Sequence, residues 1–271
     1  MPSQELQTTV EAARAGAAVI STYTQRSRAQ SFELKGRHDL VTEADVASEN
    51  AIKSVIRRMY PDDQMLAEES HGGDGLTDAR TWIIDPIDGT TNFAHGVPFY
   101  SVSIALWIKQ EPAVALVLGV AQDELFTAEA GQGTRLNGHS IRVSQTTEPA
   151  EALIGTGFPY RDLSVLEDYM KVFHVLMRET HGVRRPGSAA YDMAYVAAGR
   201  YDGFYEYALA PWDVGAGALL IREAGGLVTD WDGGEQWLTG KRITAGNPSI
   251  HAYLQQTILA NIRAELRKAV S

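Results

Sequence analysis

The chain has 271 residues, of which 44% are hydrophobic and 21% charged, a composition that excludes a disordered or fibrous protein. Its 24 basic and 34 acidic residues give a net charge of −10, which argues against a nucleic-acid partner because an acidic surface repels phosphate backbones. The absence of cysteine excludes disulfides, thiolate metal sites and cysteine nucleophiles. It is compatible with a reducing compartment, so we expect a cytoplasmic protein.

The length favours one continuous domain over residues 1–271, divided, if at all, into lobes at about 1–148 and 149–271. The N-terminus lacks a basic segment followed by an apolar core, and no window approaches the roughly 20 apolar residues that span a bilayer, so no membrane partner is expected. The pairs Arg57–Arg58 and Arg184–Arg185 are interpreted as solvated surface with no assigned partner.

Apolar residues at helical spacing predict two helices at the start of the chain. The first includes Leu6 to Ile20, and the second runs from Val46 to Met59, after which Pro61 ends it. Further helices are expected at 166–180, 189–198, 214–223 and 248–268. The last of these begins with a proline, which is favourable in a first turn, and carries basic residues in its closing turns, as the helix dipole prefers.

From Trp82 the pattern changes to short, β-rich apolar runs separated by glycine, proline and polar breaks. These runs are TWIID, YSVSIALWI, AVALVLGVA and ELFTAEA, followed later by YDGFYEY and GGLVTD. Because helices and strands alternate to the end of the chain, we expect a layered α/β or α+β fold in which helices cover mixed, mostly antiparallel sheets.

The segment WIIDPIDGTTNF carries the strongest chemical signal. A strand ends in Asp85, proline and glycine force the chain to turn, and Asp88 follows within that turn. The amides from Gly89 onward are placed to begin a short helix, whose N–H groups and dipole would attract an anion. Taken alone, the same residues could serve as a turn or helix cap.

Other acidic residues also lie at the ends of predicted elements. QMLAEES ends in Glu68 and Glu69, DLVTEAD brings Asp39 and Asp45 to a helix start, and APWDVGAGALL places Asp213 in a first helical turn. Each could instead be a cap or a surface charge. A packed group of carboxylates, however, requires a cation or a proton, since two of them about 4 Å apart repel by about 4 kcal/mol at an effective dielectric constant of 20.

Taken together, these motifs resemble the inositol monophosphatase family of lithium-sensitive, magnesium-dependent phosphatases, and the resemblance is closest to bacterial members. It extends over nearly the whole chain and includes HGVPFYSVSIAL, GSAAYDMAYVAAGRYDGFYE and PWDVGAGALLIREAGG, in the family order. The resemblance implies a layered α-β-α-β-α sandwich and a phosphatase that requires two or three Mg²⁺ ions.

What the family implies for the site can be transferred to individual residues. The metal ligands would be Glu68, Asp85, the carbonyl of Ile87, Asp88 and Asp213. Their oxygen atoms suit magnesium.

The remaining site residues are also implied by the resemblance. Thr90 with Asp45, helped by Glu68, would orient and deprotonate the attacking water. The substrate-binding residues would be Gly89, Thr90, Thr91, Ser188, Ala189 and Glu206, with Gly187 in the same wall. The segment between Leu34 and Asp39 would form a loop over the site, and its Lys35 is not counted as a site residue.

The leading substrate is myo-inositol monophosphate, because DGTTNF favours this branch over the nucleotide-bisphosphate branch, which usually has a lysine and an acid at positions 91 and 92. Alternatives are histidinol phosphate, fructose 1,6-bisphosphate and 3'-phosphoadenosine 5'-phosphate, or a non-catalytic regulatory scaffold. The family also implies a homodimer, for which the apolar strands and the helix at 166–180 could supply an interface, and inhibition by lithium.

Overall fold

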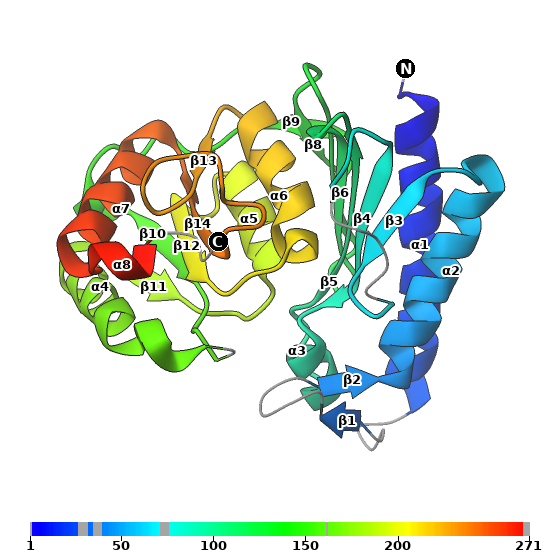
Figure 1. The fold of residues 1–271 in the computed structure, drawn as a ribbon, viewed down its shortest axis with the longest axis horizontal. Helices are drawn as coiled ribbons and strands as arrows, with labels where there is room; N and C mark the ends of the chain where they lie inside the picture. Colours follow the sequence, from blue (N-terminus) through cyan, green and yellow to red (C-terminus); the bar gives the residue numbers. More distant parts are fainter. Residues whose placement is uncertain (1, 27–31, 35–39, 71–75, 161, 268–271) are drawn as a thin grey trace.

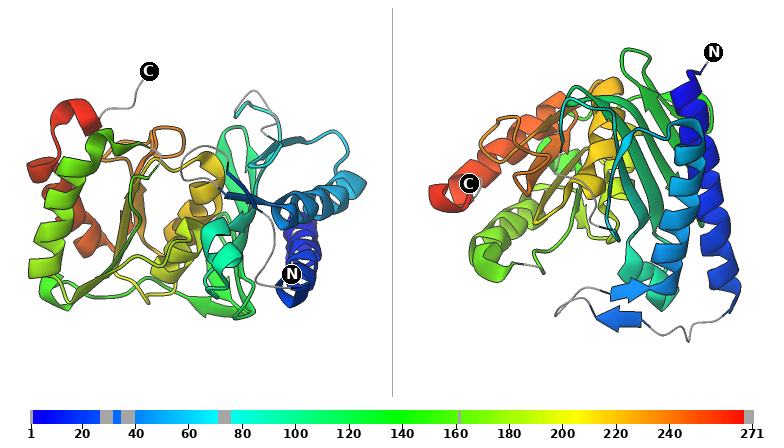
Figure 2. Two further views of the ribbon diagram at one scale, coloured as in Figure 1. Left: turned by 90° about the horizontal axis from the view of Figure 1, so that it is seen from below. Right: turned by 45° about the vertical axis from the view of Figure 1, so that its right-hand side comes forward.

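The computed structural model describes residues 2–26, 32–34, 40–70, 76–160 and 162–267, and for residues 25–42 it describes the backbone alone where it describes them. Helices and sheets alternate in five layers, as Figures 1 and 2 show. The predicted α-β-α-β-α architecture with mixed sheets is therefore confirmed.

The first layer and the first sheet come from the N-terminal half. Two long helices form the outer layer, α1 (Gln4–Arg26) and α2 (Glu43–Met59). The sheet beneath them is ordered β3-β4-β5-β6-β7-β8-β9. Its strands are β3 (Gln64–Ala67), β4 (Thr81–Asp88), β5 (Ser101–Ile108), β6 (Glu111–Gly119), β7 (Glu124–Glu129), β8 (Thr134–Leu136) and β9 (His139–Ile141). Only the β3–β4 pair of this sheet is parallel.

The second sheet is ordered β11-β10-β12-β14-β13 and comes from the C-terminal half. Its strands are β10 (Leu153–Thr156), β11 (Gly182–Arg184), β12 (Gly203–Tyr207), β13 (Leu227–Thr229) and β14 (Arg242–Gly246). Helices α5 (Ala189–Ala197) and α6 (Pro211–Glu223) lie between the two sheets, and α4 (Leu166–Glu179) and α7 (Pro248–Asn261) cover the outer face (Figure 1).

Smaller elements complete the chain. They are the pair β1 (Phe32–Leu34) and β2 (Leu40–Thr42), α3 (Thr90–His95), α8 (Ala264–Arg267) and two 3₁₀ turns, Pro149–Glu151 and Leu163–Val165. Asp39 and Lys35 lie outside the described residues. Within the described ranges, none of the helices combines the length and the apolarity that a bilayer crossing needs.

Alternating side chains divide the interior into three cores, as the two-residue period of a strand requires. On β4, Trp82 and Ile84 face α1 and α2, whereas Ile83 faces α5 and α6. On β12, Phe204 faces α5 and α6, whereas Tyr205 faces α4 and α7. Helices α5 and α6 are therefore covered on both sides, which explains why most of their residues are buried.

The predicted helix 248–268 is wrong in its last third. Helix α7 ends at Asn261, because Ile262 adopts an extended conformation (φ −103°, ψ 127°) and is buried in the core beneath α4. The N–H and Nε of Arg263 then donate to Asp168 Oδ2 at 3.1 and 2.9 Å. Burial of Ile262 and the hydrogen bonds of Arg263 thus stabilise the chain more than another helical turn would, and α8 begins only at Ala264.

Candidate metal and phosphate site

The end of β4 carries two carboxylates on a kinked strand. The pairing with β5 shifts by one residue between Asp85, opposite Ser103, and Asp88, opposite Ser101, so β4 holds one extra residue there. The strand that was expected to end at Asp85 continues through this bulge to Asp88. The N–H of Ile87 donates to Asp85 Oδ1 at 3.0 Å, which fixes that carboxylate across Pro86. Both aspartates are buried, with 1% and 7% of their surface exposed.

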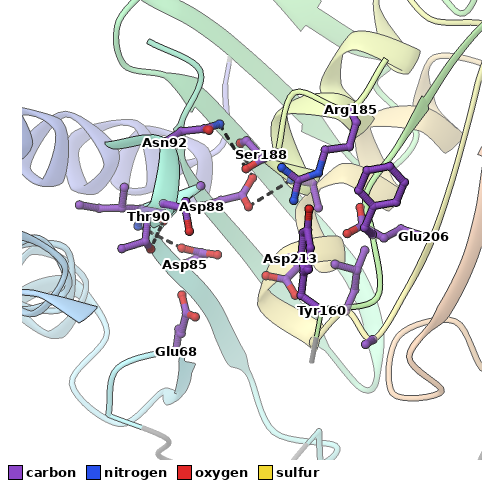
Figure 3. A pocket seen from close by; sticks show the side chains of 18 of the residues that line it. Glu68, Asp85, Asp88, Thr90, Asn92, Tyr160, Arg185, Ser188, Glu206 and Asp213 are labelled. Carbon is purple, nitrogen blue, oxygen red and sulfur yellow. Dashed lines mark hydrogen bonds between the residues drawn. The ribbon is translucent and has the colours of Figure 1, made fainter. Parts of the chain in front are cut away.

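A third carboxylate comes from the start of α6. Asp213 is the third residue of that helix, and its Oδ2 accepts from the N–H of Ala210 at 2.6 Å, as in a capping box. One oxygen each of Asp85, Asp88 and Asp213 lies within 4.8 Å of the others. The convergence expected from the sequence is therefore present (Figure 3).

Asp88 is held by groups at the start of α5. Its Oδ2 accepts from Ser188 Oγ at 2.5 Å and from the N–H of Ala190 at 2.8 Å, and its Oδ1 accepts from the N–H of Ala189 at 3.1 Å. Ser188 and Ala189 line the cavity as expected, but these donors are directed at Asp88. They therefore fix a carboxylate in the orientation that the cluster needs.

Thr90 and Asp45 are also brought together. Thr90 Oγ1 lies 3.2 Å from Asp45 Oδ1 and 3.0 Å from the carbonyl oxygen of Ile87. Asp45 is fully buried at the start of α2, so its carboxylate is shielded from water. A hydroxyl between two acceptors is well placed to receive and pass on a proton.

Glu68 follows β3 and lines the same cavity, but it lies outside the group of three close carboxylates. Its main-chain N–H donates to the carbonyl of Ile84 at 3.1 Å, which continues the pairing of β3 with β4. The next residue is tied to α2, because the N–H of Glu69 donates to Glu49 Oε2 at 2.8 Å. The backbone that carries Glu68 is therefore fixed on both sides.

The expected short helix begins at Thr90, with Gly89 before it in a left-handed conformation (φ 96°). A Cβ at Gly89 would lie 3.1 Å from the carbonyl of Gly187 and 3.2 Å from that of Phe99, so both conformation and space require glycine. The first N–H groups of a helix have no acceptor within it. Those at the start of α3 are therefore available to an anion beside the carboxylates.

Electrostatics indicates that the cluster favours a cation or a proton between its carboxylates. Burial, reinforced by the charges of Glu68, Asp88 and Asp213, raises the pKa of Asp85 well above its usual value. Burial also raises the pKa of Asp88, although the hydrogen bonds from Ser188 and the α5 amides oppose this. A divalent cation would relieve both effects, and the all-oxygen ligand set fits a hard ion such as magnesium or calcium.

The cavity that contains these groups has a volume of about 170 Å³. Tyr160, Arg185 and Glu206 lie on the side of the cavity opposite Glu68 and Thr90 (Figure 3). Phe158 and Tyr207 also line the cavity. Gly187 lines the wall as expected.

Sequence reasoning missed three kinds of residue here. Arg185, interpreted as solvated surface, is exposed but lines the cavity. Tyr160 and Phe158 carried no motif that would have identified them. Asn92 joins two walls, because its Nδ2 donates to the carbonyls of Phe99 at 2.7 Å and Pro186 at 2.8 Å. Its place inside DGTTNF was the available signal.

Comparison with known proteins gives one consistent family. Residues 1–267 match the model of the inositol monophosphatase family. A curated relative, the Nus factor SuhB of Pseudomonas aeruginosa, is 43% identical over 96% of this chain and 97% of its own.

Solved structures agree with this. The extragenic suppressor protein suhB from Bartonella henselae is similar, with a TM-score of 0.89 and 39% identity over 94% of this chain and 98% of that one. The inositol monophosphatase from Anabaena has a TM-score of 0.83 and 40% identity over 96% and 97% of the two chains. This chain belongs to the inositol monophosphatase family.

Proposed function

We propose that the protein hydrolyses small phosphate monoesters in a magnesium-dependent reaction, with myo-inositol monophosphate as the first substrate to test. The observation that carries this proposal is the group formed by Asp85, Asp88 and Asp213, whose oxygens lie within 4.8 Å of one another beside the start of α3. Carboxylates that can bind magnesium thus lie beside free amides that can bind a phosphate group, as magnesium-dependent hydrolysis of a phosphate ester requires.

In this proposal Glu68, Asp85 and the carbonyl of Ile87 would hold one magnesium ion, and Asp85, Asp88 and Asp213 would hold a second. When bound, magnesium neutralises the phosphate dianion and lowers the pKa of a coordinated water. The hydrogen bonds to Asp88 from Ser188 and Ala189 support its role, because they orient the carboxylate before any ligand arrives.

Residues of the chain then accept the proton and bind the phosphate. Thr90 Oγ1 orients the attacking water and passes its proton toward Asp45, with which it is hydrogen-bonded, while Glu68 lies nearby. The amides of Gly89, Thr90 and Thr91 hold phosphate oxygens. Water oxygen bonds to phosphorus, the bond between phosphorus and the ester oxygen breaks, and the leaving alkoxide takes a proton from solvent.

Glu206 is the proposed acceptor for substrate hydroxyls. It lines the cavity across from Glu68 and Thr90 (Figure 3). A carboxylate there accepts hydrogen bonds from a polyol such as inositol.

Phosphate release should be measured from inositol 1-phosphate, histidinol phosphate, fructose 1,6-bisphosphate and 3'-phosphoadenosine 5'-phosphate, with and without Mg²⁺. Asp88→Asn should abolish release, whereas the exposed Asp62→Asn makes the same chemical change on the surface and should not. Magnesium binding by calorimetry gives a second readout. Absence of release from all four esters, with intact magnesium binding, would point to a scaffold.

A second candidate function rests on the relatives that are named Nus factors, such as that of Pseudomonas aeruginosa. We propose that this chain, too, associates with the transcription machinery, through protein contacts rather than through nucleic acid, given its net charge of −10. Binding to purified RNA polymerase from the source organism should then persist in Asp88→Asn. Loss of binding together with activity, or no binding at all, would contradict an independent role.

We also propose a homodimer in the cytoplasm. Met170 and Met177 on α4 are exposed by 41% and 61%, and Leu163 just before that helix by 49%, so an apolar strip faces outward there. Light scattering coupled to gel filtration tests this, with Met177→Glu expected to shift the protein toward monomer.

A further inference from the structure

Arg185 is the one cationic side chain among the described residues that line the cavity, whereas five carboxylates line it. Within the described part of the chain, its guanidinium makes no ion pair and donates no hydrogen bond. Figure 3 shows it on the side of Tyr160 and Glu206, across the cavity from Glu68 and Thr90. All five of its N–H donors therefore remain available to a ligand.

The position of this side chain is fixed from two directions. Its Cζ lies 5.0 Å from the ring centre of Tyr160 and 5.7 Å from that of Phe158, distances at which a cation is attracted to the ring face. Its backbone is fixed as well, because Asn92 Nδ2 donates to the carbonyl of the following Pro186. The guanidinium is therefore oriented before a ligand binds, which lowers the entropic cost of binding.

The guanidinium is also directed back over the cavity wall. A Cβ at Gly187 would lie 3.1 Å from Arg185 Nη1. Gly187 is itself a lining residue, next to the Ser188 that bonds Asp88. Arg185 therefore belongs to the wall that also carries Gly187 and Ser188, and Ser188 is the residue that donates to Asp88.

We propose that Arg185 binds a second anionic group on the alcohol part of the substrate, so that an additional phosphate or carboxylate raises kcat/KM above that of the matched ester without it. The planar guanidinium matches such a group with two parallel hydrogen bonds. This inference rests on the proposed phosphatase function and deepens it by naming the substrate class. Glu206 then selects hydroxyls, and Arg185 selects charge.

A different role for Arg185 would be to balance the negative charge beside it. Asp192 is 1% exposed. Burial, together with the negative charge of Glu206, raises the pKa of Asp192 well above its usual value, and the positive charge of Arg185 opposes that rise. If charge balance were the whole role, loss of the arginine would change the hydrolysis of all esters by the same factor. A second-anion subsite instead changes the ratio between charged and neutral substrates.

The test uses two matched substrate pairs with Mg²⁺. The first pair is fructose 1,6-bisphosphate and fructose 1-phosphate, which differ by one phosphate. The second pair is 3-phosphoglycerate and glycerol 3-phosphate, which differ in that a carboxylate replaces a hydroxymethyl group. For each pair the ratio of kcat/KM is measured in the wild type, Arg185→Ala, Arg185→Lys and Arg184→Ala. Arg184 is the matched control, because it is an exposed neighbour that bonds the carbonyl of Val183 and does not line the cavity.

We expect Arg185→Ala to lower the ratio for at least one pair by about tenfold or more, the effect of losing charge-assisted hydrogen bonds. Arg185→Lys should recover part of it, and Arg184→Ala should stay within about twofold of the wild type. The pair that responds tells whether phosphate or carboxylate is bound.

Unchanged ratios in Arg185→Ala, with melting temperatures showing that the variant folds, would overturn the subsite and leave the phosphatase standing. If the wild type releases no phosphate from these four substrates, the subsite proposal fails; if inositol 1-phosphate and the other esters of the first panel are also not hydrolysed, the proposed function fails with it.

Discussion

The main chain of Gly157 lies directly against the carboxylate of Glu206: a Cβ at position 157 would be 1.8 Å from Oε1 and 2.1 Å from Cδ. Gly157 follows β10 and Glu206 lies on the parallel neighbour β12, so neither backbone can retreat easily. We expect Gly157→Ala to turn the carboxylate away and to raise KM for inositol 1-phosphate by about tenfold, with a smaller change in kcat.

The control is a double-mutant cycle. In a Glu206→Ala background there is no carboxylate to displace, so Gly157→Ala should add little to KM. An equal rise in KM in both backgrounds would mean that Gly157 acts on the substrate by another route. Melting temperatures of the four proteins separate this effect from a loss of folding.

Much of this architecture could be predicted because its signals are local. Helical periods identified α1, α2, α4, α5 and α6, and apolar β-rich runs between glycine, proline and polar breaks identified the long strands β4 to β7. Glycine and proline also marked the irregular backbone between Asp85 and Asp88, although β4 continues through it. Acids at element ends were expected to converge, and three of them do.

What could not be predicted depends on contacts distant in sequence. The three-residue strands β8, β9 and β11 are too short to show a period, and they form only because a longer neighbour pairs with them. The end of α7 is set by Asp168, 95 residues from Arg263. Arg185 resembled a surface residue because its aromatic neighbours are Phe158 and Tyr160, about 25 residues upstream.

Helices α5 and α6 pack closely at Gly217, where a Cβ would lie 2.6 Å from Met193 Cβ. That atom is attached to the α5 backbone, so the helices must separate to accept a methyl group. Gly217→Ala should therefore lower the free energy of unfolding by about 1–3 kcal/mol in urea titrations. Gly215→Ala is the matched control, because its nearest neighbours are 3.4 Å away and alanine favours helix by up to about 1 kcal/mol. Equal stability of the two variants would mean that the α5–α6 contact can accept a methyl group at position 217 without loss of packing.

Asp168 should make stability depend on acid pH. Its side chain is 2% exposed, and Oδ1 accepts from Lys171 Nζ at 2.6 Å while Oδ2 accepts from the N–H and Nε of Arg263. The hydrogen bond from Lys171 and those from Arg263 hold the pKa of Asp168 well below its usual value. The folded pKa is thus lower than the unfolded one of about 3.9, so the contribution is complete well above pH 4 and is lost as pH falls toward the folded pKa.

Asp168→Asn should accordingly lower the free energy of unfolding by about 1–3 kcal/mol at pH 7, and the difference from the wild type should narrow below about pH 4. Asp123→Asn removes the exposed pair with Arg14 and should cost at most about 1 kcal/mol. Chemical unfolding from pH 7 to pH 3 measures both. A constant difference across that range would show that Asp168 acts by shape rather than by charge.

A buried ion pair on α2 anchors the segment that carries Glu68. Glu49 and Lys53 are 3% and 8% exposed and lie 3.2 Å apart between Oε1 and Nζ. Glu49 Oε2 accepts from the N–H of Glu69, and Lys53 Nζ donates to Ser70 Oγ at 2.9 Å. Both partners therefore hold the two residues that follow Glu68.

Glu49→Gln leaves Lys53 buried without a carboxylate, so it should lower the free energy of unfolding by about 3–5 kcal/mol. Because the chain next to Glu68 then loses its charged anchor, the Mg²⁺ concentration for half-maximal phosphate release should also rise several-fold. Glu43→Gln, an exposed change on the same helix, is the control and should alter neither quantity. A loss of stability with an unchanged magnesium requirement would show that the pair supports α2 alone, since displacing Glu68, the proposed ligand, should change that requirement.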